Sequence, residues 1–401
     1  MKNKSEGCMS TATSPPRTAE AAARSSYKPG LEGVIAGESA LCQVDEGAAG
    51  LRYRGYAIGD LAEWSSFEEV AYLLLFGHLP TSKEVNEFAG WLVQNRTLPE
   101  SVRPFLMEIV HPEMHPMDVL RTGISLLGLG DPEAQDVSHE ANLRKSVRLL
   151  SQMPSLIAEM HHVKTGRLRT SADPSQTFAQ ALLFLLTGRK GDGIARAMAE
   201  VLNVSLILYA EHELNASTFA ARVTASTLTD LHGAITAAVA ALKGPLHGGA
   251  NEAVASMLFE IGSPDRAESW VREALSQKRR VMGFGHRVLR QGDARSTIIQ
   301  RHAEQLSHLC GDRRWYEIAS TINRIMREEK GLYPNLDFYT AVAYLLMGIP
   351  CELYTPLFVC SRMSGWCAHV IEQQDHNRLI RPRALYTGPP PREYVPLDRR
   401  G

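Results

Sequence analysis

Residues 66–84 read SFEEVAYLLLFGHLPTSKE and hold the boundary signals of two consecutive helices. Ser66 precedes an acidic turn and an apolar run that stops at Gly77, with a proline shortly after. A short polar residue at the N-cap, acids in the first turn and a glycine past the last turn are typical helix boundaries. Thr81 and Glu84 have the spacing of a capping box for the next helix. This stretch predicts helix following helix through a short break.

The same signals recur along the chain. They predict helices over residues 100–110, 117–127, 140–162, 177–186, 193–211, 216–242, 249–261, 267–278, 296–309, 314–330, 338–347 and 356–373. Residues 30–56 hold short β-prone pieces between glycines, which predict a small N-terminal β-hairpin or two. Because strands and helices do not alternate, we expect an all-α fold.

Residues 234–242 are nearly all small or apolar. A helix with this composition is expected to be buried around its whole circumference. Small side chains also let helix backbones approach closely. We therefore place this helix either in the middle of a large core or at an oligomer interface.

Composition excludes several classes of protein. The 401 residues carry 43 Lys and Arg against 44 Asp and Glu, and this balance argues against a nucleic-acid partner. No apolar run is long enough for a membrane span, and residues 1–27 are expected to be a flexible tail. The six cysteines form no CxxC pair, which favours a reducing, cytoplasmic location.

Three motifs place a catalytic residue type inside a turn shaped by glycine or proline. The first is GPLHGGAN at residues 244–251, where His247 precedes two glycines and the start of a new helix. Backbone without side chains can approach a ligand there, and the free N–H groups of the helix attract negative charge. A structural histidine in a turn is the alternative for this motif alone.

The second motif, GFGHR at residues 283–287, repeats this arrangement around His286. From Lys278 to Arg295 there are six basic residues and a single acid. Such a local excess inside a nearly neutral chain predicts an anionic ligand, either a phosphate or a carboxylate.

The third motif, YPNLDFY at residues 333–339, holds Asp337 among apolar and aromatic residues at a loop-to-helix junction. Such surroundings raise the pKa of a carboxyl group toward the range of a general base. Helix N-capping by Asp337 or Asn335 is an equally weighted alternative.

Two other motifs are interpreted as structural. His111 and His115 have the i, i+4 spacing of metal ligands, but a proline separates them and the pattern is not HExxH, so capping and packing are preferred. Residues 188–193 lack the signature of a nucleotide loop and predict a turn between two helices.

These motifs in this order resemble the citrate synthase family, including its 2-methylcitrate synthase branch. The segments that carry the resemblance are PLHGGAN, GFGHRVLRQGDAR, YPNLDFY, residues 211–218, 361–366 and 377–383. The resemblance covers nearly everything after residue 28. It implies a mostly helical homodimer with a large domain (28–248 and 349–401) and a small domain (249–348) that closes over the substrates.

The resemblance also implies roles for individual residues. Asp337 matches the base that takes a proton from the acetyl methyl group, His247 the hydrogen-bond donor to the thioester oxygen, and His286 the group that polarises the oxaloacetate carbonyl. The oxaloacetate ligands of the family match His212, Arg295 and Arg362. The family's CoA-binding region matches Val281, Met282, Gly283, Phe284, Gly285 and Arg290.

An arginine that reaches the partner's site across the dimer matches Arg381, with Arg378 and Arg383 competing for this role. The implied activity is an acyltransferase reaction that condenses acetyl-CoA with oxaloacetate and water to give citrate and CoA, as in the tricarboxylic acid cycle. Acyl-CoA is a co-substrate, and neither a permanent cofactor nor a metal is expected. The alternatives are a 2-methylcitrate synthase that uses propionyl-CoA and, more remotely, a non-catalytic helical CoA-binding or scaffold protein.

Overall fold

The structure is a computed structural model that describes residues 27–45, 50–168, 170–285 and 292–400. Contacts divide the chain into residues 39–380 and a second unit made of the two terminal segments, 1–38 and 381–401. In the terminal unit the described residues form two short 3-10 helices, η1 (Pro29–Leu31) and η3 (Leu397–Arg399), and are otherwise irregular.

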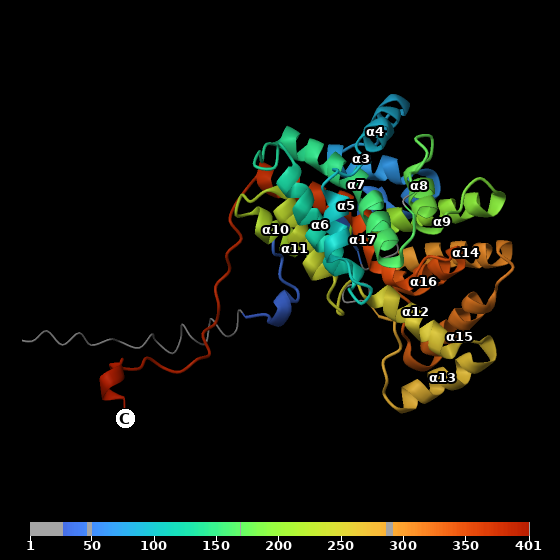
Figure 1. Cartoon of the computed structure of the whole chain (residues 1–401). Coiled ribbons are helices and arrows are strands. Elements are labelled where there is room, and N and C mark those ends of the chain that lie inside the picture. The colour runs from blue at the N-terminus through green and yellow to red at the C-terminus, as the bar shows by residue number, and fades with distance from the viewer. Residues whose placement is uncertain (1–26, 46–49, 169, 286–291, 401) are drawn as a thin grey trace, which may run out of the picture. The chain divides into compact units, whose positions relative to one another are not determined.

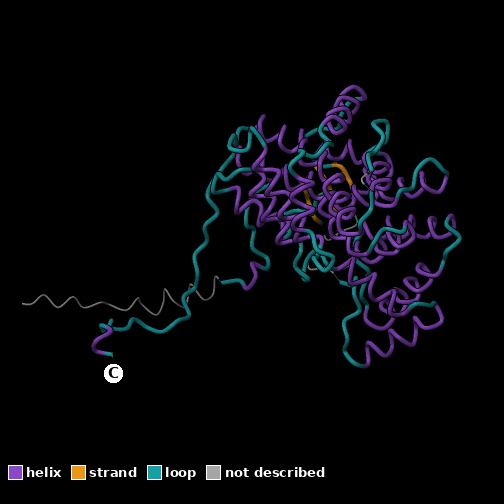
Figure 2. The backbone as a smooth tube through the Cα atoms, in the orientation of Figure 1, coloured by secondary structure: helices purple, strands orange, loops and turns teal. Residues whose placement is uncertain are grey.

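The unit of residues 39–380 is helical apart from one small sheet, as Figure 2 shows. Its helices in chain order are α2 (Ile58–Trp64), α3 (Phe67–Phe76), α4 (Ser82–Gln94), α5 (Val102–Ile109), α6 (Pro116–Gly130), α7 (His139–Thr165), α8 (Phe178–Thr187), α9 (Gly193–Tyr209), α10 (Ala216–Ala225), α11 (Leu231–Leu242), α12 (Ala250–Ile261), α13 (Pro264–Ser276), α14 (Ala294–Leu309), α15 (Arg314–Lys330), α16 (Leu336–Met347), η2 (Cys351–Leu353) and α17 (Tyr354–Asp375). The predicted all-α class is confirmed.

The sheet consists of the antiparallel strands β1 (Cys42–Val44), β2 (Leu51–Tyr53) and β3 (Tyr56–Ala57), in that order. The predicted hairpin is confirmed, and β3 extends it through the pairing of Tyr53 with Tyr56. The sequence interpretation did not include α2, which begins directly after β3. Among the described residues these are the only strands, so the sheet is a minor element beside the helices that form the core.

Predicted helix boundaries are confirmed where capping residues mark them. Ser66 and Thr81 each accept a hydrogen bond from the backbone N–H three residues on, and both capping boxes are complete. Gly77 ends α3 with φ of +88°, a conformation that glycine adopts without steric cost. His115 caps α6 by accepting from the N–H of Met117, in agreement with its structural interpretation.

Residues 216–242 do not form the single helix that the sequence predicted. The chain breaks between α10 and α11 because Asp230 accepts a hydrogen bond from the N–H of Gly233 and starts a new helix. Leu228, just before it, has φ of +63°, which a continuous helix would not allow. The α11 helix buries one face against the chain, whereas Ala240 on the opposite face is exposed, so burial around its whole circumference within this chain is also wrong.

The core lies around α17, which is buried along nearly its entire length. In Figure 1 this helix runs through the middle of the unit, and it packs against α3, α7, α9, α10 and α11. At one end of the unit α12, α13 and α15 lie together, with α13 packed on α15 and α12 on α16. The α14 helix joins this group to the rest, because it packs on α16 and also on α9 and α2.

Candidate active site

Two buried arginines contact the C-terminal end of α9. The Nε atom of Arg362, on α17, donates to the carbonyl oxygen of Tyr209 at 2.6 Å. An NH1 group of Arg295, on α14, donates to the carbonyl oxygen of Leu208 at 3.5 Å. The last carbonyls of a helix have no partner within the helix, and the negative end of its dipole favours cations there. Two residues predicted to bind oxaloacetate therefore lie at the same helix terminus.

Asp337 lies in the first turn of α16 but does not cap it. The side chain of Asn335 is the N-cap, accepting from the N–H of Asp337 at 3.1 Å. This arrangement leaves the Asp337 carboxylate available, and its Oδ1 accepts a hydrogen bond of 2.6 Å from the Tyr209 hydroxyl. Burial raises the pKa of Asp337 to about 6, although Tyr209 and the charges of Arg295 and Arg362 act in the opposite direction. The predicted rise in the pKa of this carboxyl is thus present.

His247 is held as a neutral ring with a defined tautomer. The backbone N–H of Ser217 donates to its Nε2 at 3.3 Å, and the Ser217 hydroxyl lies 2.8 Å from the same atom. Because Nε2 accepts from a backbone N–H, the ring proton is assigned to Nδ1. Burial, followed by the charge of Arg362, lowers the pKa of His247 to about 4. At neutral pH the histidine is therefore an uncharged donor through Nδ1.

The ring of Phe358, on α17, joins these groups. It packs against the Tyr209 ring with centroids 4.4 Å apart and against the His247 ring at 6.2 Å. The guanidinium carbon of Arg362 lies 4.7 Å from its centroid. The structure thus brings together Asp337, through Tyr209, with His247 and Arg362, three residues that the sequence predicted at widely separated positions.

The two arginines differ in how their charge is balanced. Arg295 forms a two-pronged ion pair with Asp293, with contacts of 3.0 and 2.8 Å. Burial alone would lower the pKa of Arg295, but the carboxylate of Asp293 raises it overall. Arg362 is only 2% exposed, and within the described part of the chain its NH1 atom has no hydrogen-bond partner. A buried guanidinium in this state is a ready site for a carboxylate ligand.

His212 follows α9 and is buried beside Glu211, which is fully buried. The Oε1 atom of Glu211 lies 2.9 Å from Nε2 of His369, whose Nδ1 lies 3.0 Å from a guanidinium nitrogen of Arg222. Since a guanidinium can only donate, His369 accepts at Nδ1 and donates to Glu211 through Nε2. This chain of polar contacts fixes the carboxylate next to His212.

The predicted CoA-binding loop is connected directly to the loop that carries Asp337. Phe284 pairs with Pro334 as an antiparallel bridge, and the N–H of Asn335 donates to the carbonyl of Gly283 at 2.9 Å. Gly283 has φ of +82°, and a Cβ there would lie 2.7 Å from Phe338. The remaining residues of this prediction that the structure describes are Val281, Met282 and Gly285.

Three predicted residues are not placed at this site. His286 and Arg290 lie outside the described residues. Arg381 belongs to the unit of terminal segments. Sequence reasoning in turn missed Tyr209, Ser217 and Phe358, which hold Asp337 and His247 through contacts between distant parts of the chain. No local signal marks their role, because Tyr209 and Phe358 have the appearance of ordinary core aromatics and Ser217 that of a residue in the first turn of a capped helix.

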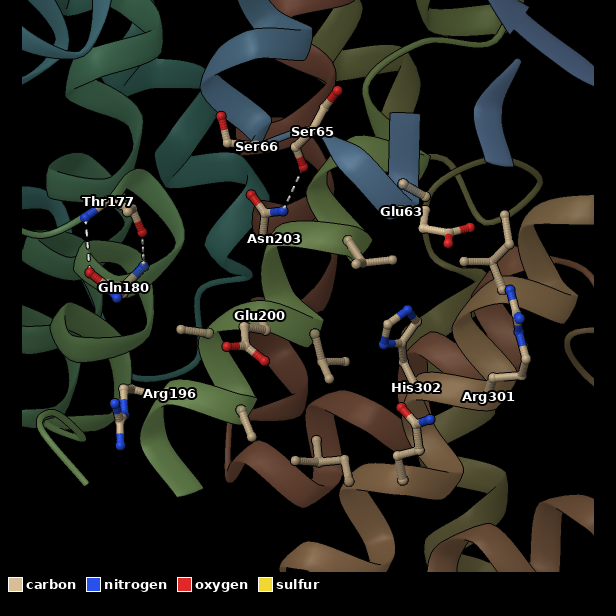
Figure 3. A pocket seen from close by; sticks show the side chains of 18 of the residues that line it. Glu63, Ser65, Ser66, Thr177, Gln180, Arg196, Glu200, Asn203, Arg301 and His302 are labelled. Carbon is tan, nitrogen blue, oxygen red and sulfur yellow. Dashed lines mark hydrogen bonds between the residues drawn. The ribbon is translucent and has the colours of Figure 1, made fainter. Parts of the chain in front are cut away.

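A groove of about 680 Å³ lies between α2, α9 and α14 and is separate from these residues. Figure 3 shows Glu63, Glu200, Arg301 and His302 around it. None of the residues that line it is one of those predicted for catalysis or substrate binding. The groove follows the contact between α14 and α9, so its shape depends on how these two helices are placed.

Comparison with known proteins gives a consistent result. The family described as "Citrate synthase, C-terminal domain" matches residues 30–383. Citrate synthase 2 of Bacillus subtilis is 45% identical, covering 92% of this chain and 98% of its own. The 2-methylcitrate synthase of Shewanella oneidensis is 44% identical, covering 92% of this chain and 97% of its own.

Solved structures agree with the sequence matches. Citrate synthase from Thermotoga maritima superposes with a TM-score of 0.81 at 38% identity, covering 93% of this chain and 99% of its own. The citrate synthase of Thermoplasma acidophilum, in ternary complex with carboxymethyl coenzyme A and oxaloacetate, gives a TM-score of 0.85 at 33% identity, covering 93% and 99%. On these matches, the chain belongs to the citrate synthase family.

Proposed function

We propose that this protein condenses acetyl-CoA with oxaloacetate and water to give citrate and CoA. The observation that carries the proposal is the group formed by Asp337, Tyr209 and Arg362. The Tyr209 side chain bonds the carboxylate of Asp337, and the Tyr209 carbonyl bonds the guanidinium of Arg362. Tyr209 thus connects a partly buried base to a buried anion site, which is the pairing that a carbon–carbon condensation on a carboxylate substrate needs.

The enolisation step requires a base and a donor acting together. A thioester methyl group is a very weak acid, so a carboxylate can remove its proton only if the oxygen that becomes an enol receives a hydrogen bond. Asp337 would take the proton, and the Nδ1–H of neutral His247 would donate to the thioester oxygen. Burial lowers the pKa of His247 to about 4, so the ring stays neutral at physiological pH, and the hydrogen bond from the Ser217 N–H to Nε2 keeps its proton on Nδ1.

The second substrate, oxaloacetate, is a dianion with a ketone. Arg362 and Arg295 would bind its carboxylates, with His212 beside them, because a fork of N–H donors matches a carboxylate in two-pronged geometry. Holding the ketone carbon next to the enol supplies much of the rate enhancement, because the translational and rotational entropy is lost on binding and not in the reaction step. His286 would polarise the ketone, and the citryl thioester formed by carbon–carbon bonding would then be hydrolysed.

The acyl-CoA would be held by the loop of residues 281–285 together with Arg290. Propionyl-CoA is the alternative substrate, since a relative named 2-methylcitrate synthase matches at nearly the same identity as one named citrate synthase. One methylene changes the binding free energy in an apolar pocket by about 1–3 kcal/mol. A non-catalytic CoA-binding scaffold would have no use for a buried guanidinium such as that of Arg362, which keeps one nitrogen without a hydrogen-bond partner among the described residues, and this argues against that alternative.

The proposal also includes a homodimer, supported by the exposed small-residue face of α11 around Ala240. In it Arg381 would reach the partner's site, and residues 249–348 would act as a small domain that closes over the substrates. Free thiols at all described cysteines fit a reducing compartment, so we propose a cytoplasmic enzyme of the tricarboxylic acid cycle. Among the described residues no helix is long and apolar enough to cross a bilayer.

The test is the rate of free-thiol release by the purified enzyme at saturating oxaloacetate, with acetyl-CoA in one series and propionyl-CoA in the other. We expect thiol release only when both substrates are present, with the higher kcat/KM for acetyl-CoA. A higher kcat/KM for propionyl-CoA would assign the 2-methylcitrate reaction instead. No oxaloacetate-dependent thiol release with either compound would reject the proposal.

A further inference from the structure

We infer that Tyr209 is a positioning residue for the base: its hydroxyl fixes one oxygen of Asp337 and keeps the carboxylate ionised, so that the other oxygen is free to take the proton. This inference rests on the proposed function, in which Asp337 is the base.

The geometry defines the direction of the hydrogen bond. Tyr209 is the last residue of α9 and is 2% exposed, and its hydroxyl lies 2.6 Å from Oδ1 of Asp337. Burial, followed by the nearby charge of Asp337, raises the pKa of Tyr209 well above its usual value. The phenol therefore stays protonated and donates, and the carboxylate accepts. Within the described residues, it is the only donor to the Asp337 side chain, so Oδ2 has no competing hydrogen bond.

The tyrosine ring is itself held rigidly. It packs on Phe358 at a centroid distance of 4.4 Å, and its backbone carbonyl is engaged by Arg362. A hydroxyl on so constrained a ring fixes the rotation of the carboxylate about its Cβ–Cγ bond. Because the hydrogen bond to the base comes from the hydroxyl, a Phe side chain at this position would remove it, together with the interaction of the hydroxyl with Thr340. The ring packing and the Arg362 bond to the backbone carbonyl would stay in place.

The hydrogen bond also acts on the protonation of Asp337. Among the described residues, the charged and titratable groups that interact with the carboxylate are Tyr209 from α9, Arg295 and Asp293 at the start of α14, Arg362 from α17 and, more weakly, Tyr344 from α16. Burial raises the pKa of the carboxyl to about 6, and Tyr209 is the strongest influence that lowers it. Without the hydroxyl, more of the base would be protonated, and hence inactive, at neutral pH.

The variant that tests the inference is Tyr209→Phe, with kcat measured from pH 5 to 9 at saturating substrates. A hydrogen bond to a charged group corresponds to about one to two pH units. We expect the acidic limb of the kcat profile to move up by this amount, so that the loss of rate is about 5- to 50-fold greater at pH 6 than at pH 9. The KM for oxaloacetate should change less than about threefold, because Arg362 keeps its bond to the backbone.

Tyr344→Phe is the matched control. Tyr344 is as buried as Tyr209 and lies on the same helix as Asp337, but its hydroxyl is hydrogen-bonded to the Ser205 hydroxyl at 2.7 Å. We expect its acidic limb to coincide with that of the wild type. If Tyr209→Phe also left the acidic limb of the kcat profile at its wild-type pH, or if both variants shifted this limb equally, Tyr209 would have no specific role and the inference would be wrong.

A second variant covers the case in which Tyr209→Phe does not fold. Incorporation of 3-fluorotyrosine at position 209 retains the hydroxyl and makes it a stronger donor, so the limb should move to lower pH. No movement would overturn the inference. Asp337→Asn tests the role of Asp337 as the base independently of the role of Tyr209. Full activity in that variant would reject the base itself. Loss of activity there, combined with an unmoved limb in Tyr209→Phe, would reject only the role of Tyr209.

Discussion

Replacing Arg362 with leucine separates substrate binding from stability. Its guanidinium is 2% exposed, is bonded through Nε to the Tyr209 carbonyl, and retains an NH1 atom without a partner among the described residues. Burial lowers the pKa of this arginine, which reflects the cost of keeping a charge away from water. The variant loses one hydrogen bond, the contact with the Phe358 ring and the attraction of the buried Glu211 carboxylate, and it also removes that cost. We therefore expect the free energy of unfolding without substrate to stay within about 1 kcal/mol of the wild type.

Binding should respond much more strongly. Hydrogen bonds to a charged group contribute about 1.5–3 kcal/mol each, so the loss of a carboxylate fork should weaken oxaloacetate binding by about 100-fold or more. At a concentration of 100 times the wild-type Kd, oxaloacetate stabilises the wild-type enzyme by about 2.7 kcal/mol. At the same concentration a 100-fold weaker variant gains only about 0.4 kcal/mol. Urea unfolding with and without oxaloacetate measures both quantities.

Arg222→Leu is the matched comparison. Arg222 is similarly buried, at 7% exposure, but it is paired with Glu372 at 2.6 Å and bonded to Gln373 at 3.1 Å. Breaking a buried pair leaves an uncompensated charge and costs about 3–5 kcal/mol, so this variant should be strongly destabilised. If Arg362→Leu behaved in the same way, or kept the full stabilisation by oxaloacetate, the assignment of Arg362 as an anion site would be refuted.

Three further predictions concern other parts of the molecule. The kcat of the wild type should fall as the pH drops below about 6, because Asp337 must be ionised to accept a proton; a kcat profile flat down to pH 5 would contradict this. Gly283→Ala should lower the free energy of unfolding by about 1–3 kcal/mol in urea titrations, since its Cβ would meet Phe338. Gly285 has the same φ of +82° but no described atom where a Cβ would lie, so Gly285→Ala should cost only about 1 kcal/mol, and equal effects would argue against the steric reasoning. Crystals with and without oxaloacetate should differ by a rotation of residues 249–348 about the glycines at 244–249; superposable structures would exclude closure.

Local signals accounted for most of the fold. Helix boundaries followed from capping residues such as Ser66 and Thr81, because a cap acts within one turn and is visible in the sequence. The break between α10 and α11 was missed because the apolar segments on its two sides were joined into one helix, although Thr229 and Asp230 are residue types that favour a helix cap over a helix interior. The short α2 helix has no capping side chain at its start, and this explains its absence from the prediction.

For the site, the sequence predicted candidate catalytic residues but not the contacts that hold them in place. Asp337 was recognised by its apolar neighbours, whereas Tyr209, which bonds it, is 128 residues away in the sequence. Likewise, capping of α16 by Asp337 or Asn335 had the same weight as a catalytic role for this motif, and only the geometry assigns the cap to Asn335. Contacts of this kind depend on tertiary packing, which periodicity and spacing do not encode.

The most direct test of the proposed condensation is the rate of thiol release by Asp337→Asn beside that of the wild type. Both are measured with saturating acetyl-CoA and oxaloacetate, and citrate is quantified as the product. We predict one citrate per thiol in the wild type and a rate about 100- to 10,000-fold lower in the variant, which should still be stabilised by oxaloacetate. A variant that released thiol at the wild-type rate, or a wild type that released thiol without forming citrate, would contradict the proposed mechanism.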